Sequence, residues 1–164
     1  NVISITDGQI FLESDLFNSG MRPAVNVGLS VSRVGGAAQT KAMKKAAGTI
    51  RIDLAQYREM EVFTQFSSDL DDATKEQLQY GKGLMELLKQ PLCHPMSLAD
   101  QVITLVTANN RLLLDVETKQ TKDFQLRLLD FFHAEHKDIV DELNNNKVLN
   151  EELTEKIVAA ELTC

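Results

Sequence analysis

The sequence has 164 residues, enough for one ordinary domain or for one small domain joined to part of another. It is 43% hydrophobic and 25% charged, which is typical of a globular protein rather than a disordered one. The formal net charge of −7 disfavours nucleic-acid phosphates and anionic membrane surfaces as partners, and no basic stripe with interleaved aromatic residues argues for DNA or RNA binding.

Other simple classes are also disfavoured by the sequence. No apolar run approaches the ~20 residues that span a bilayer, and no signal or transit peptide is present. The chain starts on an apolar run without an initiator Met, so we expect a truncated N-terminus. The two cysteines, Cys93 and Cys164, are too far apart for a disulfide framework, and the spacing of His133 and His136 lacks the neighbours of a zinc site.

The first third of the chain is predicted to contain short strands and loops. Residues 2–5 and 10–12 are strand-like, a turn lies between them, and a short helical turn is expected near residues 14–17. Residues 25–34 are interpreted as strand and loop, closed by Gly35 and Gly36. Because two or three short strands do not make an independently stable sheet, we expect their partners to lie outside this chain.

From residue 37 onward the apolar spacing becomes helical. One long helix is predicted over residues 37–66, bent near Gly48. Ser97 and Asp100 resemble a capping box at a helix start. Further helices are predicted at residues 72–80, 82–90, 97–109, 111–116, 121–135, 136–145 and 150–162. The predicted fold class is therefore mainly α, with a C-terminal antiparallel helical bundle whose core includes Phe124, Leu128, Phe131 and Phe132.

No complete active site is visible in the sequence. It lacks both the Gly-x-x-x-x-Gly-Lys-Ser/Thr phosphate cradle and the Gly-x-Ser-x-Gly nucleophile elbow. The unusual residue is Arg33, an isolated arginine at the end of a strand-like run. It is either a surface arginine with a long apolar stem, or an arginine presented to a phosphate, where its planar fork can donate two hydrogen bonds.

Several runs resemble the alpha subunit of F-type ATP synthases. They are NVISITDGQIFL at 1–12, GMRPAVNVGLSVSRVG at 20–35, LAQYRE at 54–59, FSSDLD at 66–71 and ELLKQ at 86–90. The resemblance is dense over residues 1–91 and continues as a matching helical pattern over 92–164. It implies that residues 1–36 are the end of an incomplete α/β nucleotide-binding domain of the P-loop, RecA-like kind. The helix 37–66 would lead out of that domain, and residues 67–164 would form the C-terminal helical domain.

The resemblance also implies roles for individual residues. Arg33 occupies the place of the family's arginine finger, and Ser4 matches a serine on the same catalytic interface, so both would act in trans on a neighbouring beta subunit. The adenine pocket of the alpha subunit's own Mg-ATP or Mg-ADP site would be lined by Phe17, Arg22, Pro23 and Gln90. Two departures are Leu92, where many members carry a second adenine-contacting glutamine, and Gly36, which replaces a common serine. The phosphate-binding loop would lie upstream of this chain.

The implied protein is a regulatory, non-catalytic ring subunit that supports ATP synthesis coupled to proton transport and is inactive as an isolated piece. Its partners would be beta subunits, a central gamma subunit and a peripheral delta subunit, and it would meet the membrane only through the complex. In a bacterium this is the cytoplasmic face of the inner membrane; in a eukaryote it is an organellar inner or thylakoid membrane. The alternative is a helical protein-interaction module without a nucleotide role; a complete small nucleotide hydrolase is disfavoured by the missing phosphate loop.

Overall fold

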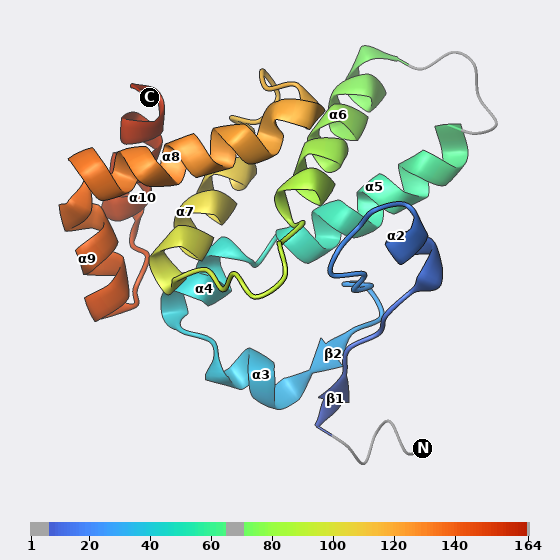
Figure 1. The fold of residues 1–164 in the computed structure, drawn as a ribbon, viewed down its shortest axis with the longest axis horizontal. Helices are drawn as coiled ribbons and strands as arrows, with labels where there is room; N and C mark the ends of the chain where they lie inside the picture. The colour runs from blue at the N-terminus through green and yellow to red at the C-terminus, as the bar shows by residue number, and fades with distance from the viewer. Residues whose placement is uncertain (1–6, 65–70, 164) are drawn as a thin grey trace.

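The computed structural model describes residues 7–64 and 71–163, and over these residues the protein is mainly helical, as predicted (Figure 1). The predicted strand at 2–5 and Ser4 lie outside the described residues. In chain order the elements are β1 (Gly8–Gln9), α2 (Ser14–Asn18), β2 (Val31–Ser32), α3 (Arg33–Ala38), α4 (Lys41–Ala46), α5 (Ile50–Thr64), α6 (Asp72–Leu87), α7 (Leu98–Asn109), the 3-10 helix η1 (Thr118–Gln120), α8 (Thr121–Glu135), α9 (Lys137–Asn146) and α10 (Glu151–Glu161).

The N-terminal strands differ from the prediction. β1 lies at the predicted turn and not at residues 10–12, and β2 covers only two residues of the predicted strand and loop at 25–34. β1 and β2 are antiparallel, with Gly8 opposite Ser32, and an isolated bridge joins Leu12 to Val25. The expectation that all strand partners lie outside the chain is therefore wrong for these two strands. Their surroundings remain open, since Ile10 is 74% exposed and β1, β2 and α3 lie outside the packed helices in Figure 1.

The predicted long helix at 37–66 is wrong: three helices, α3, α4 and α5, occupy this stretch. The first break comes at Thr40, whose hydroxyl accepts a hydrogen bond from Met43 N and caps α4. The second comes at the turn around Gly48, where Asn109 of α7 donates to Ala46 O and accepts from the Thr49 hydroxyl. A side chain distant in sequence thus satisfies the backbone where the helix stops.

Two other helix boundaries differ from the prediction. The two helices predicted at 72–80 and 82–90 are one helix, α6, which continues through Gly81, where Tyr57 packs closely against the backbone. Residues 111–116 form turns rather than a helix. The helix predicted at 97–109 is confirmed as α7, and it begins with the expected capping box between Ser97 and Asp100.

The apolar residues form two neighbouring cores. The larger core joins α4, α7, α8, α9 and α10, and its fully buried members include Phe132, Leu143 and Ile157. The predicted aromatic stripe belongs to it, since Leu128 is buried and Phe124 and Phe131 pack against the cluster. The smaller core joins α5 and α6 through Leu54, Tyr80 and Leu84. Among the described helices, none is long and apolar enough to cross a membrane.

Candidate functional site

Arg33 lies at the junction of β2 and α3. Its backbone N–H donates to Asp7 O at 3.3 Å, and the preceding residue, Ser32, caps α3 by accepting from Gly35 N at 2.9 Å. A Cβ on Gly35 would crowd the Ser32 hydroxyl, so a larger residue there would require the Ser32 side chain to shift. These backbone bonds fix the direction in which Arg33 leaves the chain.

The side chain of Arg33 is available to a ligand. It is exposed, and over residues 7–64 and 71–163 its guanidinium makes no hydrogen bond or ion pair. The group carries a permanent positive charge and five donors in a planar fork. Its surroundings therefore fit a phosphate supplied from outside the described residues.

A broad groove of about 1700 Å³ brings together the four residues predicted for adenine binding. Phe17 lies on α2, Arg22 and Pro23 on the loop after it, and Gln90 just beyond the end of α6. The Arg22 guanidinium carbon lies 4.4 Å from the centroid of the Phe17 ring, in the range of a cation–π contact. The groove thus offers an aromatic face already paired with a cation.

A backbone hydrogen bond joins the two sides of the groove. Gln90 N donates to Arg22 O at 2.9 Å, and the Gln90 side-chain amide donates to His94 O at 2.7 Å. The amide oxygen of Gln90 remains able to accept a hydrogen bond from a ligand. Leu92, the departure from the family pattern, also lines the groove and is 90% exposed.

Helix α8 forms a wall of the groove that the sequence does not predict. Lys122 Nζ donates to Leu87 O at 2.7 Å and to Gln125 Oε1 at 2.8 Å, and burial lowers the pKa of Lys122 below its ordinary value. Gln125 is buried and donates to the Thr104 hydroxyl. Lys122 therefore fixes the end of α6 against α8, which sets the position of Gln90. The weak sequence signal for this wall is that Gln125 falls three residues before the buried Leu128.

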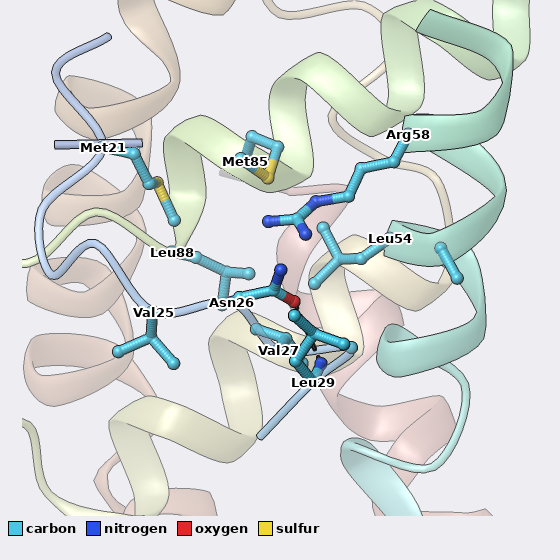
Figure 2. Close-up of a pocket in the computed structure, with 11 residues that line it drawn as sticks. Met21, Val25, Asn26, Val27, Leu29, Leu54, Arg58, Met85 and Leu88 are labelled. Atoms are coloured by element: carbon cyan, nitrogen blue, oxygen red, sulfur yellow. Dashed lines mark hydrogen bonds between the residues drawn. The ribbon is translucent and has the colours of Figure 1, made fainter. Parts of the chain in front are cut away.

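A second, smaller hollow of about 310 Å³ separates the loop at residues 21–29 from α5 and α6 (Figure 2). Its walls are mostly apolar, and Figure 2 shows the Arg58 guanidinium pointing toward Asn26 between Leu54 and Met85. Asn26 is buried, donates to Glu13 Oε1 and accepts from Leu29 N, so its amide is already satisfied. This hollow is the seam between the N-terminal segment and the helical part of the chain.

Arg33 does not line the groove, so the structure separates the predicted catalytic residue from the predicted adenine-binding residues. Within the described part of the chain, no cluster of three or more His, Cys, Asp or Glu side chains could hold a metal ion.

Comparison with known proteins defines the class. A model of the C-terminal domain of ATP synthase alpha/beta chains matches residues 39–162, and a model of the nucleotide-binding domain of the ATP synthase alpha/beta family matches residues 1–32. The chain therefore belongs to the ATP synthase alpha/beta family.

Within that family the sequence corresponds to the C-terminal portion of the alpha subunit, comprising the end of the nucleotide-binding domain and the C-terminal domain. It is 57% identical over 157 residues to the ATP synthase subunit alpha of Proteus mirabilis (strain HI4320). This match covers 96% of the chain but only 31% of the relative, so the chain spans about a third of that protein's length.

Proposed function

We propose that this chain is the part of an F-type ATP synthase alpha subunit that supplies Arg33 in trans to a nucleotide held by a neighbouring beta subunit. The observation that carries the proposal is the exposed guanidinium of Arg33 on a backbone fixed by β2 and the Ser32 cap. In phosphoryl transfer, charge develops on the phosphate oxygens, and an arginine supplied by a neighbour stabilises it. Ser4 is proposed to lie on the same interface.

The groove is proposed to hold the adenine of the alpha subunit's own regulatory nucleotide. A planar base fits against Phe17, and the exocyclic amine of adenine can donate to the amide oxygen of Gln90. Arg22 and Pro23 complete this side of the pocket. Because no acidic cluster suited to a metal occurs among the described residues, the Mg²⁺ of bound ATP or ADP is proposed to be held by upstream residues together with the phosphate loop.

In this proposal the chain acts only within a ring of alternating alpha and beta subunits around a gamma subunit, with a delta subunit at the peripheral stalk. The ring would support ATP synthesis coupled to proton transport, on the cytoplasmic face of the inner membrane in a bacterium. The chain alone would hydrolyse no ATP. Its contact with the membrane would be indirect, through the complex.

A tryptophan reporter tests the groove. The chain contains no Trp, so Phe17→Trp in the complete alpha subunit adds a single local fluorophore from this chain that keeps an aromatic face for Arg22. We expect Mg-ATP to quench its fluorescence with saturation, because adenine stacks on the ring. Phe11→Trp is the control, since Phe11 is also exposed but does not line the groove. Equal quenching of both reporters, or none in the Phe17→Trp variant, would count against the adenine site.

A further inference from the structure

A buried acid holds the last described helix against the centre of the bundle. Glu161, at the end of α10, is only 7% exposed, and its Oε1 lies 2.5 Å from the hydroxyl of Thr107 on α7. The other carboxyl oxygen, Oε2, is buried and makes no hydrogen bond. The proposed function uses neither residue.

The single hydroxyl hydrogen of Thr107 bears on the protonation state of Glu161. The Thr107 hydroxyl also lies 2.9 Å from Ile103 O, a carbonyl that can only accept. A hydroxyl has one hydrogen, so Thr107 cannot give a full hydrogen bond to both acceptors. Two full hydrogen bonds form when Glu161 donates to Thr107 while Thr107 donates to Ile103 O, and this arrangement favours a protonated carboxyl group.

The unpartnered oxygen supports the same state. A buried carboxylate with only one hydrogen bond would leave a charge largely unsolvated, whereas the carbonyl oxygen of a neutral acid is far less costly to bury. Burial raises the pKa of Glu161 to about 7. A Thr107 hydroxyl that donated to the carboxylate would oppose this shift, whereas a carboxyl group that donates to Thr107 does not oppose it.

The charged groups around α7 and α10 are engaged elsewhere or face solvent. Asp100 of α7 pairs with His133, and Arg111, one turn beyond Thr107, pairs with Glu76. On α10, Lys156 pairs with Glu152, and both Glu155 and the lysines of the neighbouring α4 (Lys41, Lys44 and Lys45) are exposed. None of these groups contributes to the shifted pKa of Glu161.

We propose that Glu161 and Thr107 form a proton-binding site that docks α10 on α7 when the carboxyl group is protonated and loosens it when the proton leaves. The folded site then holds a proton at pH values where the opened helix has released it. Opening of α10 therefore becomes easier as pH rises from about 4.5 to about 7, and changes little above that range.

The direct test is the carboxyl ¹³C resonance of Glu161, followed by NMR against pH in the wild-type chain, which requires no substitution. We expect it to titrate near neutrality, well above an ordinary glutamate. The second readout is amide hydrogen exchange in α10, corrected for the intrinsic pH dependence of exchange. Protection should fall roughly 50-fold between pH 5 and pH 8 in the wild type.

Glu161→Gln keeps the shape and a donor for Thr107 but cannot lose a proton, so its α10 protection should not change with pH. Glu155→Gln is the matched control on the exposed face of the same helix and should behave as the wild type. A Glu161 resonance that titrates like an exposed glutamate overturns the proposal. So does an equal loss of protection with rising pH in Glu161→Gln.

Discussion

The ring of Tyr57 on α5 occupies the space that a side chain at Gly81 on α6 would need. A Cβ built at Gly81 would lie far inside van der Waals contact with three atoms of Tyr57, and both residues are buried. Glycine in the middle of α6 is therefore explained by the close approach of α5. The two helices meet in the smaller core, next to the hollow of Figure 2.

Gly81→Ala should destabilise the protein by about 1–3 kcal/mol, because overpacking outweighs the gain of up to ~1 kcal/mol in helix propensity. Chemical denaturation followed by circular dichroism measures the change. Gly83→Ala is the matched control two residues along the same helix, where a Cβ would make only an ordinary contact with Leu113. Comparable losses in both variants would contradict the role given to Tyr57.

Both tyrosines of the chain should resist ionisation in the folded protein. Burial, with the neighbouring Glu61, raises the pKa of Tyr57 to about 12, and burial, with Asp53, raises that of Tyr80 further. In the unfolded chain both ionise near pH 10. The folded state therefore keeps protons that the unfolded state releases, so this contribution to stability is lost as pH rises above about 10.

Ultraviolet absorbance detects the phenolate, and these two residues supply the whole tyrosine signal of the chain. We expect the folded chain to show little phenolate at pH 10 and the chain in denaturant to show about half. Replacing the acceptor of Tyr80, as in Asp53→Asn, should move part of the folded transition toward lower pH. A normal transition near pH 10 in the folded protein would contradict the buried environment of both rings.

Leu92→Gln should strengthen nucleotide binding in the groove. Leu92 is almost fully exposed, so the change leaves the cores intact, and the new amide can add a hydrogen bond to a base held near Gln90. One added hydrogen bond corresponds to roughly 2–10-fold in affinity. Titration of Mg-ATP against the Phe17→Trp reporter measures it in the complete subunit. Gln90→Ala should weaken binding by a similar factor. Unchanged affinity in both variants would contradict the proposal that adenine binds in this groove.

Local patterns in the sequence predict local features of the fold well. Ser97 and Asp100 place the start of α7 correctly, because a capping box is built from residues three apart. The stripe of Leu128 and Phe132 finds the buried face of α8, because helical periodicity depends only on nearby positions. The mainly α fold class follows from such signals.

Features that depend on contacts between distant segments are not predicted. The break near Gly48 depends on Asn109, some sixty positions away, and the groove depends on Lys122, which reaches the end of α6. Nothing in the sequence distinguishes Glu161 from the other acidic residues of the chain. Its burial against Thr107 is visible only in the structure. The resemblance predicts the candidate adenine residues, and the fold brings them into one groove.

Arg33 is the residue on which the proposed function depends most, and steady-state ATP hydrolysis tests its role. A ring assembled from complete alpha subunits carrying Arg33→Lys, with beta and gamma subunits, is compared with the unchanged ring at saturating Mg-ATP. Lysine keeps the charge but loses the planar fork, so we predict that groove binding of nucleotide is retained while multi-site turnover falls by about 10³-fold or more. Near-normal turnover in the Arg33→Lys ring would contradict the claim that this arginine serves a neighbour's nucleotide.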